Sequence, residues 1–194
     1  MTVPTRAVAA QPVKLLALGD SLTAGYGLPE PQGFTRQLEK ALAAKGYSVT
    51  VVNAGVSGDT TAGGRARLDW ALADKPDAAI VELGANDMLR GLDPGRAEAN
   101  LDAILAELGR RHIPVLLAGM VAAPNLGPDY AGRFNPIYAR LAKKHRVPLY
   151  PFFLEGIVGD RSLHIGDAIH PNGRGVAVIA RGIAPQVKQL LTRR

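Results

Sequence analysis

The 194-residue chain contains no cysteine, few aromatic residues and no long apolar run. Without cysteine it has neither a disulfide framework nor thiol chemistry, which leaves its compartment open. No apolar run approaches the roughly 20 residues of a membrane-spanning helix, so we expect no stable membrane insertion. The formal net charge is +6, but the basic residues are scattered among acids without interleaved aromatics. This pattern argues against nucleic-acid binding.

Hydrophobic residues make up 47% of the chain, enough for one domain with its own core. We expect that domain to span residues 12–194. Residues 1–11 are polar and rich in small residues, and predict a flexible leader. Ala7 to Ala10 resemble the small-residue site after which signal peptidase cuts, although no apolar segment precedes them. We therefore interpret residues 1–11 as the remnant of a signal peptide, which favours export to the periplasm or the medium, with a cytoplasmic location as the alternative.

Short apolar segments alternate with segments of helical periodicity along the whole chain. The predicted strands are 13–18, 48–53, 78–83, 114–119 and 147–150. The predicted helices are 33–45, 61–73, 95–111, 134–145 and 173–191, and the longest irregular segment is 121–132. Continuously apolar strands that alternate with helices are typical of a parallel sheet covered on both faces. We therefore predict a three-layer α/β/α sandwich around a five-stranded parallel sheet in the order 2-1-3-4-5.

Ser21 lies directly after the first predicted strand, at the edge where open parallel sheets bind ligands. In the predicted strand order the loops after strands one, two and three meet, which brings Ser21, Gly58 and Asn86 together. The backbone N–H groups of Ser21 and Gly58 and the side-chain amide of Asn86 would then surround one point. Three donors beside a hydroxyl are what a tetrahedral oxyanion next to its nucleophile requires.

His170 is the candidate base, because the segment 167–171 follows the fifth strand at the same edge. Asp167 precedes it by three residues, close enough for its carboxylate to hold Nδ1–H and aim Nε2 at Ser21. His164 competes for this role, and its spacing to Asp167 and His170 also allows a metal site. Three ligands on one loop without a fourth make a poor zinc site, so we predict no metal and no cofactor.

Each of these residues also has a plain structural interpretation. A serine after a strand can cap a helix, Asn86 can cap the turn that it precedes, and Gly58 can permit a positive φ. Glu82 stands inside a buried strand, where a carboxylate must be paired or hydrogen-bonded, and we expect it to support the site from below. We expect Asp20 and Asp87, which flank the key residues, to accept hydrogen bonds from the loops.

Four short blocks of the sequence resemble the GDSL family of lipases and esterases, also called SGNH hydrolases. They are Gly19-Asp20-Ser21-Leu22, Ser57-Gly58-Asp59-Thr60, Gly84-Ala85-Asn86-Asp87 and Asp167-Ala168-Ile169-His170-Pro171. They span almost the whole chain, and the residues beside them are most similar to the bacterial thioesterase, arylesterase and lysophospholipase branch. The resemblance implies the flavodoxin-like SGNH fold, with Ser21 as nucleophile, His170 as base and Asp167 as its orienting group. It also implies that Gly58 and Asn86 are oxyanion donors.

The segment 121–132 follows the fourth strand at the same edge as the serine, and loops so placed usually carry binding. Leu126 and Tyr130 offer apolar surface there, and Met88 and Leu89 come from the neighbouring loop. We expect the two loops to form a shallow groove for short to medium acyl chains. Close relatives in the family often carry glycine at the position of Met88, so its side chain is expected to narrow or line the acyl pocket.

Two classes of function fit these observations. The first is a serine hydrolase acting on aryl esters, short- to medium-chain acyl esters, lysophospholipids or acyl thioesters, or else a carbohydrate acetylesterase of the same fold. The second is a non-catalytic, flavodoxin-like ligand-binding domain, but neither G-x-G-x-x-G nor G-x-x-x-x-G-K-[ST] occurs. We therefore predict an enzyme that hydrolyses small-molecule esters or lipids and exists as a monomer or small homo-oligomer.

Overall fold

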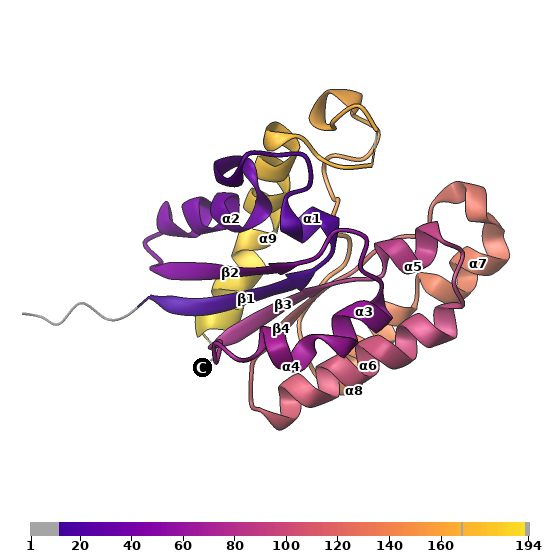
Figure 1. Ribbon diagram of the computed structural model, residues 1–194, viewed down its shortest axis with the longest axis horizontal. Coiled ribbons are helices and arrows are strands. Elements are labelled where there is room, and N and C mark those ends of the chain that lie inside the picture. Colours follow the sequence, from indigo (N-terminus) through magenta and orange to yellow (C-terminus); the bar gives the residue numbers. More distant parts are fainter. Residues whose placement is uncertain (1–11, 168, 193–194) are drawn as a thin grey trace, which may run out of the picture.

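A five-stranded, all-parallel sheet in the order β2-β1-β3-β4-β5 runs through the centre of the computed structural model (Figure 1). The strands are β1 (Val13–Gly19), β2 (Val49–Gly55), β3 (Ala78–Glu82), β4 (Val115–Ala118) and β5 (Leu149–Tyr150). The predicted strand order is therefore confirmed. The structure describes residues 12–167 and 169–192, so the predicted leader, residues 1–11, lies outside the described residues.

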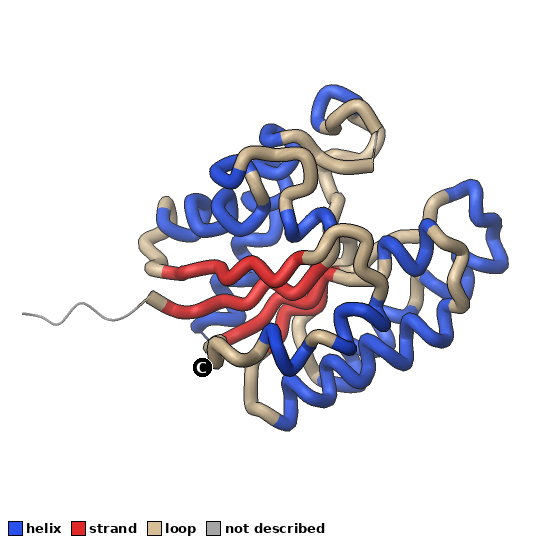
Figure 2. Tube along the Cα trace, viewed as in Figure 1, coloured by secondary structure: helices blue, strands red, loops and turns tan. Residues whose placement is uncertain are grey.

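Helices cover both faces of this sheet, as Figure 2 shows. On one face α2 (Phe34–Ala43) and α9 (Gly173–Thr192) pack against each other, and on the other lie α3 (Thr61–Ala66), α4 (Leu68–Ala71), α6 (Pro94–Arg110) and α8 (Ile137–His145). The shorter helices are α1 (Ser21–Ala24), α5 (Ala85–Leu89) and α7 (Gly127–Phe134), with 3-10 turns η1 (Glu30–Gln32), η2 (Pro124–Leu126) and η3 (Arg161–Leu163). Among the described residues, no helix combines the length and the apolar character that a membrane span requires.

Burial on both faces explains why the strands are continuously apolar. Every residue of β3 is buried, and Leu15, Leu16 and Leu18 of β1 are at most 1% exposed. In the register of the sheet, Gly19 at the end of β1 lies opposite Gly55 of β2 and Glu82 of β3. The loops that follow β1, β2 and β3 therefore leave the sheet side by side.

The segment 121–132, predicted to be irregular, contains η2 and most of α7. Pro124 and Pro128 do not prevent these helical turns, because they lie in the first turn of each element, where the missing N–H costs nothing. The single helix predicted over 61–73 is divided at Arg67 into α3 and α4. The helix predicted from residue 134 begins only at Ile137, and α5 was not predicted because five residues show too little periodicity.

Candidate active site

Ser21 is the first residue of α1 and follows the end of β1 by one intervening residue, Asp20. The carboxylate of Asp20 accepts the N–H of Leu22 at 3.0 Å and so caps this short helix. The N–H of Ser21 belongs to the first helical turn and has no intrahelical acceptor, which leaves it available to a ligand. Sequence and topology thus place a hydroxyl and a free backbone donor together at the carboxyl end of β1.

A continuous hydrogen-bonded chain joins Ser21, His170 and Asp167. The Oγ of Ser21 lies 2.9 Å from Nε2 of His170, and Nδ1 of the same ring lies 2.5 Å from Oδ2 of Asp167. The other carboxylate oxygen of Asp167 accepts the backbone N–H groups of Ile169 and His170, at 3.0 and 2.9 Å. The ring of Tyr26 lies against the imidazole, with 4.6 Å between ring centroids. This is the order of contacts that a nucleophile, its base and an orienting carboxylate require.

The carboxylate of Asp167 is held in its ionised form. Partial desolvation alone would raise the pKa of Asp167, but hydrogen bonds from the backbone and ring of His170 and from the N–H of Ile169 outweigh it and lower that pKa to about 2. An ionised acceptor fixes a proton on Nδ1, so Nε2 is left to face the serine hydroxyl.

Asn86 contacts the site through its side-chain amide. Its Nδ2 donates to Oδ2 of Asp20 at 3.0 Å, and the residue lines the same cavity as Ser21 and His170. Gly58 adopts φ +83°, and its carbonyl accepts a hydrogen bond from Arg90 at 2.7 Å. No described residue accepts the Gly58 N–H, and Gly58 is not part of the cavity wall. Of the three predicted oxyanion donors, the cavity therefore holds Ser21 and Asn86.

Two buried carboxyl groups lie beneath these donors, on Asp20 and Glu82, both 0% exposed. Burial raises the pKa of Asp20 to about 6, against the opposing effects of its hydrogen bonds from the Leu22 backbone and the Asn86 amide. Burial, together with the charge of Asp20, raises the pKa of Glu82 well above its usual value. Glu82 accepts the Thr23 hydroxyl at 2.7 Å and the Asp20 N–H at 3.4 Å. It therefore supports the loop from below, as predicted, and favours the protonated form.

Arg67 ties the loops after β1 and β2 together, a role that the sequence did not indicate. Its guanidinium donates to the carbonyls of Gly19 and Ala54, both at 2.8 Å, and to Oδ2 of Asp59 at 2.6 Å. Three acceptors, from the ends of β1 and β2 and from the loop after β2, match the planar fork of an arginine, and the Arg67 side chain is only 17% exposed. Beside it, Asp87 accepts the N–H and hydroxyl of a threonine in α3, both at 2.7 Å, as expected of a residue that supports the loops.

An apolar cavity of about 440 Å³ opens beside Ser21 and His170. Met88 and Leu89 lie in its wall, and the Met88 sulfur also accepts the Ala123 N–H at 3.4 Å. Further wall residues are Leu22, Ala85, Met120, Val121, Ala122, Pro124, Phe152, Leu154, Val158, His164 and Ile169. The cavity is thus built on two sides by the loops after β3 and β4.

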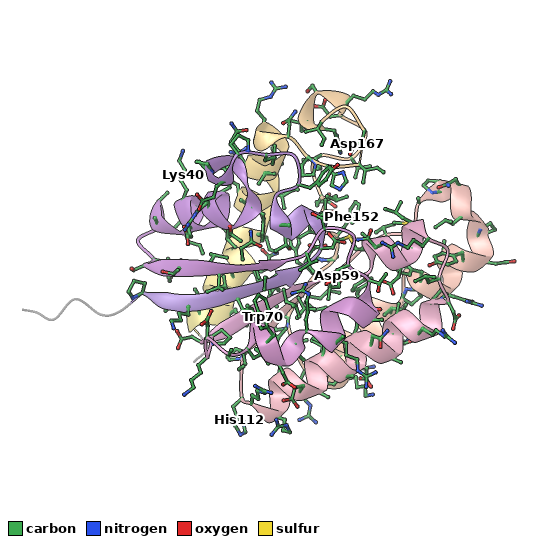
Figure 3. All side chains as sticks on the ribbon, in the orientation of Figure 1. Lys40, Asp59, Trp70, His112, Phe152 and Asp167 are labelled. Atoms are coloured by element: carbon green, nitrogen blue, oxygen red, sulfur yellow. The ribbon has the colours of Figure 1, made fainter. Side chains whose placement is uncertain are left out.

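Leu126 and Tyr130, predicted to bind substrate, do not line this cavity. Tyr130 instead donates its hydroxyl to the Leu92 carbonyl at 2.9 Å and stacks on Phe134 within the α7 region. Because the segment folds into helix, both side chains are directed to packing rather than to the site. Phe152 lines the cavity instead. It belongs to the segment between β5 and α9, which also contains Asp167 and projects over the sheet edge (Figure 3).

His164, the competing histidine, lines the cavity but does not contact Ser21. Its Nδ1 lies 2.9 Å from the Asp160 carbonyl, and His170 alone reaches the serine hydroxyl. Within the described residues, no three His, Cys, Asp or Glu side chains are grouped so that they could hold a metal ion.

The sequence also matches known proteins. The model of the GDSL-like Lipase/Acylhydrolase family matches residues 17–178. Esterase TesA of Pseudomonas aeruginosa is 41% identical over 96% of this chain and 92% of its own length. Thioesterase 1/protease 1/lysophospholipase L1 of Escherichia coli K12 is 38% identical over 91% of this chain and 84% of its own. The crystal structure of AlinE4, described as an SGNH-hydrolase family esterase, superposes with a TM-score of 0.80 at 46% identity, covering 95% of this chain and 99% of that one.

Proposed function

Because the chain belongs to the GDSL-like lipase and acylhydrolase family, we propose that it hydrolyses carboxylic esters through an acyl-enzyme on Ser21. The observation that carries this proposal is the unbroken chain from the Asp167 carboxylate through the His170 ring to the Ser21 hydroxyl. A packed structural serine needs neither a base at 2.9 Å nor an apolar cavity beside it.

In the first half of the reaction, Nε2 of His170 takes the proton of Ser21 while Oγ attacks the ester carbonyl. The carbonyl oxygen becomes an oxyanion, which the Ser21 N–H and the Asn86 amide stabilise, with the Gly58 N–H as a predicted third donor. The tetrahedral intermediate collapses when the protonated His170 gives its proton to the leaving alcohol. Water then attacks the acyl-enzyme with the same histidine as base, which releases the acid and restores Ser21.

Asp167 and Asp20 orient the two groups that touch the reacting atoms. Asp167 holds the His170 ring so that the accepting nitrogen faces the hydroxyl. Asp20 accepts one amide hydrogen of Asn86, which fixes the NH2 end of that side chain and leaves its second hydrogen for the oxyanion. Both are positioning residues rather than catalytic ones.

The substrate class follows from the cavity beside Ser21. Its wall is mainly aliphatic, with two methionines and one phenylalanine, which favours an acyl chain or aryl group over the hydroxyl-rich face of a sugar. Relatives named esterase, arylesterase and thioesterase/lysophospholipase support the same range of substrates. We therefore propose aryl and short- to medium-chain acyl esters, with lysophospholipids and acyl thioesters as further candidates.

Labelling with a fluorophosphonate tests the mechanism. The probe should modify wild-type protein at Ser21 alone and should not modify Ser21→Ala, while Ser48→Ala, an exposed serine on another surface, should label normally. A panel of p-nitrophenyl esters of increasing chain length then tests the substrate class. Turnover restricted to acetyl esters would favour a carbohydrate acetylesterase, and an absence of labelling would favour a ligand-binding domain.

Export and quaternary state are part of the same proposal. Export rests on the small residues Ala7 to Ala10, and fractionation of cells expressing the full chain tests it. A monomer or small homo-oligomer is expected, and light scattering on the purified protein measures which.

A further inference from the structure

The cations of the α2 and α9 layer are distributed differently from those of the opposite layer. No acidic residue follows Asp167 in the sequence, so α9 contains none. Its cations Arg174, Arg181 and Lys188 recur every seven residues, which is close to two helical turns and places them along one face. Lys188 lies over the Tyr47 ring, 5.6 Å from its centroid. The two arginines remain directed to the space between the helices.

A groove of about 910 Å³, roughly twice the volume of the active-site cavity, lies in that space. Its lining residues are Gln32, Gln37, Lys40, Ala41, Ala44, Lys45, Asn172, Gly173, Arg174, Ala177 and Arg181. Four of them are cationic and none is acidic. The alanines and the glycine leave an apolar floor, and the lysines and arginines surround it. Lys40 projects from α2 in Figure 3.

Among the described residues, three of the four groove cations have no carboxylate partner, and the fourth, Arg174, lies close enough to Asp160 to lower the pKa of that carboxyl group. Lys40, Lys45 and Arg181 form no ion pair there, and Arg174 donates to the Ser162 carbonyl at 2.7 Å. The acids of α2 and η1 do not compensate them, because Glu30 and Glu39 both pair with Arg36. On the opposite layer, several cations of α6 and α8 are paired, as in Arg140 with Glu98 and Lys144 with Asp102, whereas Arg96 and Lys143 form no ion pair among the described residues.

Four positive charges around one concave surface, three of them without a carboxylate partner among the described residues, create a local potential that concentrates anions. Arginine forks bind phosphate oxygens in two-point contacts, and lysine adds point charge. An apolar floor between them gives a short hydrocarbon portion a place to pack. We propose that the α2–α9 groove binds a phosphate ester that carries an apolar group, at a site separate from the catalytic cavity.

Binding to three probes tests this site on the full-length protein: inorganic phosphate, hexyl phosphate, and vesicles of phosphatidylcholine with or without phosphatidylglycerol. Amide chemical shifts should move around the groove with either soluble probe. Hexyl phosphate should bind more tightly than phosphate, by up to about fourfold for each CH2 that it buries. If phosphatidylglycerol vesicles bind as well, the ligand is a lipid headgroup; if only hexyl phosphate binds, it is a soluble phosphate ester.

The double variant Lys40→Gln with Arg181→Gln removes two groove cations. Each basic residue near an anionic surface contributes on the order of fivefold in binding, so affinity should fall about 30-fold. The matched control is Arg96→Gln with Lys143→Gln, which removes the same charges from exposed positions on the opposite layer. It should change affinity by less than about twofold, because only local charge matters within a Debye length.

Equal losses of affinity in the groove and control variants would show that the ligand is attracted by net charge alone, and would overturn the proposed binding site. So would the absence of shifts at the groove with both soluble probes. Hydrolysis of p-nitrophenyl acetate should be unchanged in both double variants, since none of these residues contacts Ser21, His170 or Asp167. The binding assays do not depend on turnover. A negative result for the groove would therefore leave the proposed esterase activity standing, and a negative result for esterase activity would leave the groove site standing.

Discussion

Two aspartates near Ser21 carry the same functional group, but their pKa values are shifted in opposite directions. Asp167 lies at the exposed edge, with its side chain 38% accessible, and its pKa is lowered to about 2 by hydrogen bonds from the adjacent backbone and ring. Asp20 is fully buried one residue before the serine, and burial raises its pKa to about 6. The difference shows that burial and hydrogen bonding, not residue type, decide the pKa of each carboxyl group.

The two aspartates also orient different groups of the active site. Asp167 orients the base, so its charge supports the imidazolium that forms when Ser21 loses its proton. Asp20 orients the oxyanion donor Asn86, and its charge can be removed at mildly acidic pH. The charged groups that face Asp20 are Glu82, Asp59 with its partner Arg67, and His170.

The largest expected effect on activity comes from removing the nucleophile or the base. Ser21→Ala or His170→Ala should lower kcat by about 10⁴–10⁶-fold with the fold intact, as in other hydrolytic triads. Steady-state turnover of a p-nitrophenyl ester measures this, with circular dichroism as the check on folding. The Ser48→Ala control should retain full activity. Turnover near the wild-type rate in either variant would remove the basis for calling Asp167 an orienting group.

The second prediction tests Asn86, the oxyanion donor that Asp20 orients. Asn86→Ala should lower kcat by about 10²–10³-fold with little change in KM, because an oxyanion donor acts mainly when charge develops. Separate measurement of kcat and KM decides the matter. A raised KM with an unchanged kcat would make Asn86 a substrate-binding residue, and the Asp20 contact would then be structural.

A smaller loss is expected when the buried carboxylate itself is changed. Asn in place of Asp20 offers one acceptor oxygen, so either the Leu22 N–H or the Asn86 amide loses its partner. An unsatisfied buried donor costs about 1–3 kcal/mol, which corresponds to a fall in kcat of about 10–100-fold if Asn86 is the group released. The acid limb of kcat against pH should also lose the component centred at about pH 6. An identical pH profile in Asp20→Asn would show that Asp20 does not act through Asn86.

The two aspartates should affect stability with opposite signs as pH changes. For Asp20 the folded pKa lies above the ordinary aspartate value of 3.8, so the folded state favours the proton, and stability falls as pH rises from 3.8 through about 6. For Asp167 the folded pKa lies below 3.8, so its contribution is present above that value and is lost toward pH 2.

Urea unfolding at several pH values measures this difference. Relative to wild type, Asp20→Asn should gain up to about 3 kcal/mol of unfolding free energy between pH 4 and 7. Asp167→Asn should lose stability relative to wild type above pH 4, and should converge with it near pH 2. The comparison between the two carboxylates fails if both variants follow the same trend.

The smallest effect concerns the cavity wall. Met88→Gly removes an 8% exposed side chain beside the acyl cavity, so the optimal p-nitrophenyl ester should become longer by a few carbons. Each additional buried CH2 contributes about 0.8 kcal/mol at most. Leu126→Ala, outside the wall, is the control and should leave the chain-length profile unchanged. If Met88→Gly also left it unchanged, the acyl group would bind elsewhere.

Several features of this protein are determined by its sequence alone. The alternation of apolar strands with periodic helices indicates a parallel sheet, because parallel strands need crossovers, and right-handed crossovers between few strands favour the order 2-1-3-4-5. That order in turn brings Ser21 and Asn86 to one edge. The spacing of Asp167 and His170 in one loop determined their contact, since three residues cannot separate a carboxylate far from a ring.

Only the tertiary structure decided the wall of the cavity and the states of the carboxylates. Phe152 and Val158 come from a segment with no periodic pattern, and pattern-based reasoning has no signal for where such a segment folds. Leu126 and Tyr130 fall outside the wall because the segment predicted to be irregular forms helical turns, which prolines in their first turns permit. The pKa of Asp20 depends on neighbours from β3, α5 and the segment before α9, which no local window contains. Solvation is a property of the assembled core, and it becomes defined only when the core has formed.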